Sequence, residues 1–432
     1  MFRFNPFLLL VFLCVSCTKT TIIKVEPNEN SGRRAVEVAY YVPQYNQPNQ
    51  GVLKSELVEA IPLEDTGKII YFNNHIFINK PQEGIHILDN TDPNNPINKS
   101  FLTLKGSIDL AIIDGYLYVD QFSALVVLDV RDLNAIELIE DFTVPEIFNY
   151  DPFWAYEPIK EVDQYEYIRF DPIDHTKGIV TGWELEVRWE TIDPYWYYLR
   201  MASQEDDSVV LEGDSEVEEV SQAGSMARFL PIDNLLYTLN NWELILFEIN
   251  ENHQPLRFGK TPTNTMEETL YRLNDLLFIG TTTGMQLYDI SDARNPKFLS
   301  QIDHFRSCDP VVADTEYAYV TLRGGTNCFT DRNELQIISL EDPKELEVVS
   351  RQLLFNPHGL AIYENFLLVC DGTAGIKVID VADKENPKVL NTYPVNFAYD
   401  VIIDFPRAMV VGEGKLYQYE ISQLPEMVLI NE

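Results

Sequence analysis

A short run of alternating apolar residues that ends in an acidic residue recurs along the chain. Residues 375–380 read Gly-Ile-Lys-Val-Ile-Asp, and a turn containing Asp383 and Asn386-Pro387 follows them. Six more copies end at Asp89, Asp129, Glu248, Asp289, Ser339 (where serine replaces the acid) and Glu420. Alternation of apolar with other residues is typical of a half-buried β-strand. Seven similar strands with similar turns indicate a fold that is built from repeats.

The spacing of these end positions selects the architecture. Successive positions are 40, 119, 41, 50, 41 and 40 residues apart. A period near 40 with several short strands per repeat is typical of a β-propeller. The gap of 119 corresponds to one repeat plus a large insertion, or to three repeats of which two are degenerate. We prefer the insertion, because the gap contains no run that ends in an acid.

Each repeat also has a hairpin upstream of the run and a further strand downstream of it. Residues 109–119 contain two apolar runs joined by Asp114-Gly115, a dipeptide that favours a tight turn. Residues 387–393 are an example of the downstream strand. We therefore predict an all-β, seven-bladed β-propeller of four-stranded antiparallel blades over residues 52–432. An insertion at about 145–222 lies between blades 2 and 3.

The repeats resemble the LVIVD repeat, a β-propeller repeat of bacterial surface and secreted proteins. The resemblance rests on residues 375–383, Gly-Ile-Lys-Val-Ile-Asp-Val-Ala-Asp, and on residues 284–292, Gly-Met-Gln-Leu-Tyr-Asp-Ile-Ser-Asp. The repeats at Glu248, Ser339 and Glu420 depart from the Asp-Pro pattern that follows the strand. The resemblance implies the fold and leaves the chemistry open, because function resides in sites that are added to a fold.

The N-terminus has the pattern of a targeting segment. Arg3 precedes an apolar stretch at residues 7–13 that is too short to span a bilayer. Cys14-Val-Ser-Cys17 resembles a bacterial lipobox, although Cys14 stands where leucine is usual. We predict a signal peptide at residues 1–17, lipidation of Cys17, a polar tether at residues 18–51 and location at the cell envelope, on the outer membrane. The alternatives are an ordinary secretory signal and an uncleaved anchor.

The charge of the chain excludes one class of partner. The net charge is −36, from 32 basic and 68 acidic residues, and nucleic-acid binding requires basic residues that neutralise phosphates. The excess of acidic residues is explained by a solvated surface that keeps the protein soluble. Leu53 to Ile61 is expected to be a strand that helps to close the ring, or else a plain linker.

Three further cysteines lie beyond the targeting segment. Cys308 and Cys328 flank the inner hairpin of the fifth repeat, and export to an oxidising compartment favours a disulfide between them. Cys370 is expected to be a buried free thiol. We expect neither a metal nor a cofactor, because no cysteine or histidine pair has metal-ligand spacing.

The insertion is rich in aromatic residues. It contains Trp154, Trp183, Trp189 and Trp196, and residues 183–189 alternate as a strand does. Such rings can form a surface that contacts sugars or proteins. The alternative is that they cover one face of the propeller and are buried.

Charged residues are expected at one mouth of the central channel, where loops into the inner strands meet loops between the second and third strands. They are Arg306, Asp309, Arg323, His358, Asp371 and Asp400. Converging charged groups at a concave site are a default binding hypothesis. Arg306 and Arg323 suit bidentate binding of a carboxylate or phosphate. The alternative is solvated loops in which the arginines pair with Asp309 and Asp371.

The sequence has no nucleophile elbow, zinc-protease helix or phosphate-binding loop. We therefore predict a membrane-anchored lipoprotein whose propeller binds an envelope protein or a glycan without catalysis. The alternative is a propeller hydrolase or lyase that uses aspartates and histidines at the channel.

Overall fold

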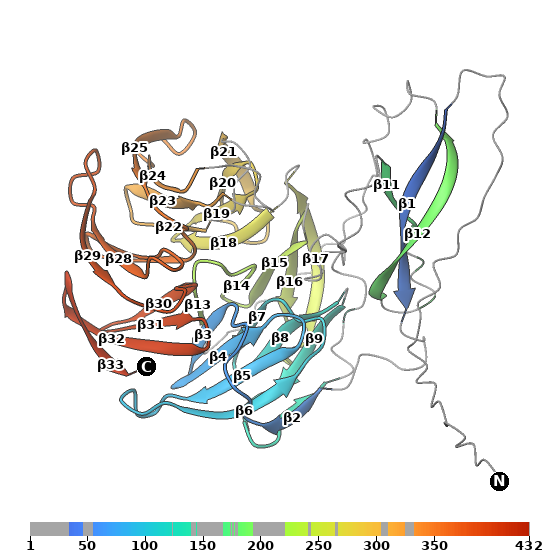
Figure 1. Cartoon of the computed structure of the whole chain (residues 1–432), viewed down its shortest axis with the longest axis horizontal. Coiled ribbons are helices and arrows are strands. Elements are labelled where there is room, and N and C mark those ends of the chain that lie inside the picture. The colour runs from blue at the N-terminus through green and yellow to red at the C-terminus, as the bar shows by residue number, and fades with distance from the viewer. Residues whose placement is uncertain are drawn as a thin grey trace, which may run out of the picture. The chain divides into compact units, whose positions relative to one another are not determined.

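The structure is a computed structural model that describes residues 34–45, 55–122, 124–139, 144, 167–172, 174, 177, 180–192, 221–240, 243–263, 267–303, 310–324 and 332–431. These residues form strands, turns and loops, with no α-helix among them. Seven antiparallel sheets are arranged as the blades of a propeller around a central channel (Figure 1). The predicted seven-bladed, all-β propeller is confirmed.

Four consecutive strands build each blade, numbered from the channel outward. Blade 1 is β3 (Ile69–Phe72), β4 (His75–Lys80), β5 (Gly84–Asp89) and β6 (Ile97–Thr103), and blade 2 is β7 (Leu110–Ile113), β8 (Tyr116–Gln121), β9 (Ala124–Asp129) and β10 (Glu137–Leu138). Blade 3 is β14 (Phe229–Ile232), β15 (Leu235–Asn240), β16 (Glu243–Ile249) and β17 (Pro255–Pro262), and blade 4 is β18 (Glu267–Leu273), β19 (Leu276–Thr281), β20 (Gly284–Asp289) and β21 (Lys297–Asp303).

The remaining blades have the same strand order. Blade 5 is β22 (Val311–Ala313), β23 (Tyr317–Leu322), β24 (Glu334–Ser339) and β25 (Glu347–Leu353). Blade 6 is β26 (Leu360–Tyr363), β27 (Phe366–Cys370), β28 (Ile376–Asp380) and β29 (Lys388–Tyr393), and blade 7 is β30 (Asp400–Asp404), β31 (Arg407–Gly412), β32 (Lys415–Gln423) and β33 (Glu426–Asn431).

Blade 1 carries two additional strands. On its outer edge β2 (Glu56–Glu59) pairs antiparallel with β6, and on its inner edge β13 (Gln222–Ala223) pairs antiparallel with β3. The strand expected within residues 53–61 is therefore present. It extends blade 1 outward and does not close the ring, because blades 1 and 7 do not share a strand.

The aspartate that ends the third strand of blades 1, 2, 4 and 6 stabilises the turn that follows it. Asp89 Oδ1 accepts the N–H of Thr91 at 3.0 Å, and Asp380 Oδ1 accepts the N–H of Ala382 at 2.9 Å. In the same turns, the second aspartate repeats this contact: Asp92 Oδ1 accepts the N–H of Asn94 at 3.0 Å. Short acidic side chains favour turns through such local bonds. The aspartates of the repeat are therefore explained by turn chemistry, whereas Glu248 of blade 3 forms an ion pair with Arg294 of blade 4.

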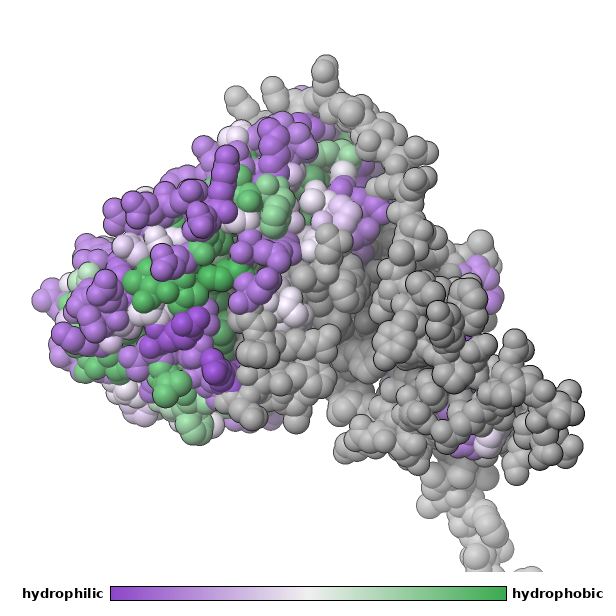
Figure 2. All heavy atoms as spheres, turned by 90° about the horizontal axis from the view of Figure 1, so that it is seen from above, coloured by the Kyte–Doolittle hydropathy of each residue, from purple (hydrophilic) through white to green (hydrophobic). Residues whose placement is uncertain are grey.

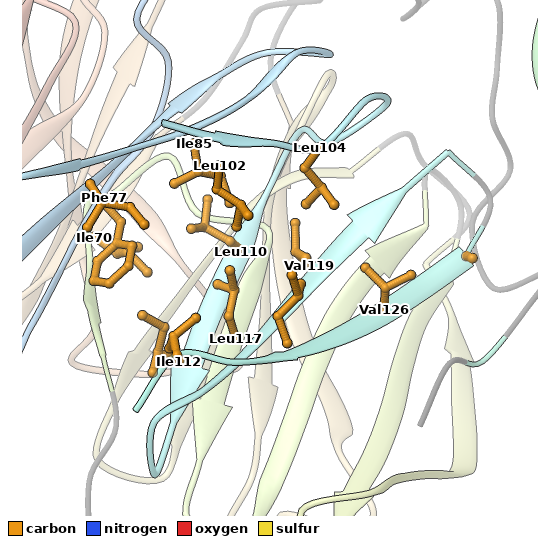
Figure 3. Close-up of a cluster of buried hydrophobic side chains, with 14 residues drawn as sticks. Ile70, Phe77, Ile85, Leu102, Leu104, Leu110, Ile112, Leu117, Val119 and Val126 are labelled. Carbon is orange, nitrogen blue, oxygen red and sulfur yellow. The ribbon is translucent and has the colours of Figure 1, made fainter. Parts of the chain in front are cut away.

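Apolar clusters hold neighbouring blades together. Seven buried clusters occur in the propeller, one between each pair of neighbouring blades. Between blades 1 and 2, Ile70 and Phe77 face Ile112 and Leu117 (Figure 3). Burial of each such side chain stabilises the fold by about 1.5–3 kcal/mol. The ring is thus held by the side chains that alternate on the two faces of every blade.

Blades 7 and 1 close the ring through packing and one polar contact. Ile69 and Ile78 of blade 1 pack against Ile402 and Met409 of blade 7. Within the same interface the side-chain amides of Asn90 and Gln418 exchange two hydrogen bonds of 3.1 and 2.7 Å. Paired amides satisfy each other's polar groups inside an apolar contact.

A second compact unit contains a three-stranded sheet. Its central strand is β1 (Arg34–Tyr45), flanked by β11 (Tyr167–Phe170), which runs parallel to β1, and by β12 (Val180–Ile192). Residues 34–45 were expected to be part of a polar tether and are a strand instead, because buried side chains such as Val38 and Ala39 give this stretch a core. β12 confirms the strand predicted at residues 183–189.

The visible surface of the propeller is mixed in polarity. Viewed from above Figure 1, hydrophilic residues surround smaller apolar areas (Figure 2). Among the described residues no helix is long and apolar enough to cross a membrane.

Candidate functional site

One equivalent residue of each blade, at or near the start of its inner strand, lies at the same end of the channel. The strand registers align seven residues there: Lys68, Asp109, Arg228, Thr269, Pro310, Gly359 and Asp400. Over the four neighbouring blades 7, 1, 2 and 3 their charges alternate: Asp400, Lys68, Asp109 and Arg228. This charged set belongs to blades 7, 1, 2 and 3, and Asp400 is the one residue of the predicted channel mouth that it contains.

Residues 221–228, here called the channel segment, lie inside this ring of blades. β13, which belongs to the channel segment, lies along β3 in the middle of the propeller (Figure 1). Ser221 exchanges two hydrogen bonds of 2.8 Å with the backbone of Ile112 in blade 2. Gln222 Nε2 donates to the carbonyl of Ile403 in blade 7 at 2.9 Å.

The second half of the channel segment contacts two further blades. The N–H of Leu360 in blade 6 donates to Ser225 Oγ at 2.8 Å, and the N–H of Leu270 in blade 4 donates to the Ala227 carbonyl at 2.7 Å. The chain then enters β14 of blade 3. The channel segment thus bonds to blades 1, 2 and 4 through its backbone and to blades 6 and 7 through the side chains of Ser225 and Gln222.

A buried ion pair lies where the channel segment ends. Lys68 Nζ and Asp109 Oδ2 are 2.5 Å apart, and the backbone N–H of Arg228 also donates to Asp109. Asp120 Oδ1 accepts the N–H groups of Ile108 and Asp109, both at 2.8 Å. Burial lowers the pKa of Lys68, and burial raises the pKa of Asp120 to about 7. The carboxyl group of Asp120 thus holds the loop before β7, and that of Asp109 holds the residue before β14 of blade 3.

Asp400 is enclosed completely. Its side chain is 0% exposed, and a Cβ placed on Gly224 of the channel segment or on Gly359 of blade 6 would overlap its carboxylate. Asp400 Oδ1 accepts the N–H of Val401 at 2.9 Å, whereas Oδ2 has no hydrogen-bond donor among the described residues. Burial raises the pKa of Asp400 to about 7, against the opposing effects of the Val401 N–H and the Lys68 charge, and the charge of Asp109 adds a smaller rise.

Two of the predicted residues form a pair. The Nη1 atom of Arg323 contacts both ring nitrogens of His358, and its distance to Nε2 is 3.1 Å. His358 is 4% exposed, and its ring packs against those of Phe397 and Tyr399 at centroid distances of 5.0 and 5.4 Å. Burial, with the charge of Arg323 as the second cause, lowers the pKa of His358 to about 3. This histidine is neutral at physiological pH and accepts from arginine.

Asp371 holds a loop. It is 0% exposed, accepts the N–H groups of Phe355 at 3.0 Å and Asn356 at 2.7 Å, and pairs with Lys377 Nζ at 3.2 Å. The cation that pairs with Asp371 in the described part of the chain is therefore Lys377, on the adjacent strand. Arg306 and Asp309 lie outside the described residues.

Some of the other predicted site residues are described by the structure, and the rest lie outside the described residues. Trp183 and Trp189 lie half-buried on β12, while Trp154 and Trp196 are outside the described residues, so a four-tryptophan surface is not supported. Cys17, Cys308 and Cys328 are also outside them. Cys370 is a buried free thiol, as predicted. In the described part of the chain no three or more His, Cys, Asp and Glu residues are arranged to hold a metal ion.

Sequence reasoning missed Lys68, Asp109, Asp120, Arg228 and the channel segment. One signal was available: Asp109 and Asp400 both stand immediately before the first apolar run of a repeat. The equivalent positions of the repeats that form blades 1 and 3 are Lys68 and Arg228. The channel segment has no periodicity and resembles the end of a linker.

Comparison with known proteins agrees with this architecture. The family model for the LVIVD repeat matches residues 105–144 and 357–394, which include the third strands of blades 2 and 6. The chain carries LVIVD repeats. No curated protein matches it.

Several solved structures are similar to this LVIVD-repeat propeller. A protein from Lactobacillus plantarum has 11% identity and a TM-score of 0.49, with 84% of this chain and 95% of that chain covered. BamB from Moraxella catarrhalis has 7% identity and a TM-score of 0.47, with coverages of 86% and 98%. A functionally unknown protein from Desulfotomaculum acetoxidans has 13% identity and a TM-score of 0.40, with coverages of 50% and 72%.

Proposed function

We propose that the protein is a lipid-anchored protein of the bacterial cell envelope whose propeller is a non-catalytic interaction module for a protein partner. The observation that carries the proposal is the filled channel. Asp109, Asp371 and Asp400 all face groups of the chain itself, and the channel segment occupies the space between the inner strands. This arrangement favours binding at the outer surface over a hydrolase or lyase centred on the channel.

Exposed apolar side chains near blade 6 supply a contact surface of the right kind. Leu353 is 75% exposed and Phe355 is 61% exposed, while Leu354 between them packs into the core between blades 5 and 6. Exposed large apolar residues on a fixed backbone are typical of protein contact sites, and aromatic residues are enriched among those that dominate binding. The predicted site residue Asp371 contributes here, because it binds the N–H of Phe355.

The experiment is site-specific photo-crosslinking in intact cells. A photoreactive amino acid at position 353 should give a discrete crosslinked species, and the Phe355→Ser variant should reduce its yield. The matched control places the same group at Leu390, which is 41% exposed on the outer strand of blade 6. Equal crosslinking at positions 353 and 390, or none at either, would count against this surface.

Anchoring is a separate part of the proposal. The lipobox-like Cys14-Val-Ser-Cys17 supports lipidation of Cys17 and residence at the membrane, with the outer membrane as the expected location. Mass spectrometry of the mature N-terminus should show an acylated cysteine. Cys17→Ala should release the protein from membranes, and a variant that stays membrane-bound would contradict the anchor.

A further inference from the structure

The channel segment is held by a carboxyl group that has unusual surroundings. Asp400 is wedged between Gly224 of the channel segment and Gly359 of blade 6, where no side chain larger than hydrogen fits. Removal of the channel segment would open one side of this enclosure to solvent. The environment of Asp400 therefore depends directly on whether the segment is in place.

Burial outweighs the groups around Asp400 that favour its ionised form. The charge of Lys68, directly before β3, favours ionisation of Asp400, but Lys68 is paired with Asp109 at 2.5 Å. Asp109 itself adds a like charge, and Cys370 of blade 6 is a neutral thiol that both Asp400 and Asp371 influence. Ser225 of the channel segment contributes a hydroxyl. An ionised carboxylate in this enclosure would lack both water and a cation of its own.

We propose that the channel segment is a proton-sensitive latch, which stays in the channel while Asp400 is protonated and leaves more readily when leaving allows Asp400 to ionise in water. Opening of the latch then releases one proton. The raised pKa of the enclosed carboxyl, about 7, agrees with this geometry. The latch leads directly into β14 of blade 3.

The sign of the pH dependence follows from this linkage. Below the ordinary pKa of an aspartate, near 3.9, the carboxyl is protonated with the latch in or out, and opening does not depend on pH. Between about pH 4 and pH 7 the open form ionises and the closed form does not, so the opening constant rises about tenfold per pH unit. Above about pH 7 both forms are ionised and the constant becomes flat.

Native-state hydrogen exchange measures this constant on the full-length protein. The backbone amides of Ser221, Gly224 and Ala227 all donate within the fold and report on the channel segment. Protection factors, which remove the intrinsic pH dependence of exchange, should fall about 50-fold between pH 5 and pH 7. Amides of β27 in blade 6 serve as an internal reference for the ring.

Two variants separate the latch from general destabilisation. Asp400→Asn keeps the size of the side chain but cannot ionise, and its protection factors should stay constant across this pH range. Asp371→Asn alters a second fully buried carboxylate of the same channel end and should keep the wild-type slope. A tenfold slope that persists in Asp400→Asn, or wild-type protection that does not change with pH, would overturn the proposal.

Discussion

Replacement of Asp371 by alanine tests how much a buried ion pair stabilises the fold next to the loop that carries Phe355. The side chain of Asp371 is 0% exposed and that of Lys377 17% exposed, and their charged atoms are 3.2 Å apart. Loss of one partner from such a pair leaves an uncompensated charge and costs about 3–5 kcal/mol. The loss also orphans the amides of Phe355 and Asn356, although water can reach the exposed loop.

Urea denaturation of Asp371→Ala, Lys377→Met and the double variant gives the required cycle. We expect Asp371→Ala to lower the free energy of unfolding by about 3–5 kcal/mol, and Lys377→Met to lower it by less, because Asp371 retains its two amide donors. The double variant should be more stable than the sum of the single effects predicts, by about 1–3 kcal/mol. Additive effects, or a change below about 0.5 kcal/mol for Asp371→Ala, would refute the reasoning.

Three further outcomes are expected. The free energy of unfolding should fall as pH rises from about 4 to about 7, because the pKa values of Asp120 and Asp400 are raised to about 7 and such carboxyls stabilise the fold only while they are protonated. Urea titrations at pH 5 and pH 8 measure this difference. Equal stabilities at the two pH values would contradict it. Leu117→Ala should cost about 2–5 kcal/mol in thermal or chemical denaturation, because Leu117 is fully buried between blades 1 and 2; a loss below about 1 kcal/mol would show that this interface is loosely packed. Gly359→Ala should also destabilise the fold, because its Cβ would overlap the Asp400 carboxylate, and Asp400→Ala in the same chain should restore part of the loss.

The blades were predictable because local chemistry repeats. Alternation fixes which side chains face a neighbouring blade, and the aspartate that ends a third strand closes its turn by a bond two residues away, as at Asp89 and Asp380. Both signals lie within a few residues of one another in the sequence. The number of copies found at a period near 40 then gives the number of blades.

The channel was only partly predictable because its contacts are remote in sequence. Asp371 and Asp400 were found as candidates, but their partners follow from the ring: Gly224 lies against Asp400 although 176 positions separate them in the printed sequence. Residues 221–228 carry no periodic pattern that marks them as an inner strand. The strand at residues 34–45 was missed for the same reason, since its partners β11 and β12 come from the insertion.

The path of the channel segment also constrains the order in which this protein can assemble. Synthesis delivers blades 1 and 2 first, and domains generally fold in that direction. When Ser221–Arg228 has emerged, its bonding partners in β3 and β7 already exist, whereas those in β18, β26 and β30 have not been made. The segment can therefore be seated on an open arc of two blades, and the later five can be added around it. A chain that completed its ring first would have to thread this strand through a closed opening.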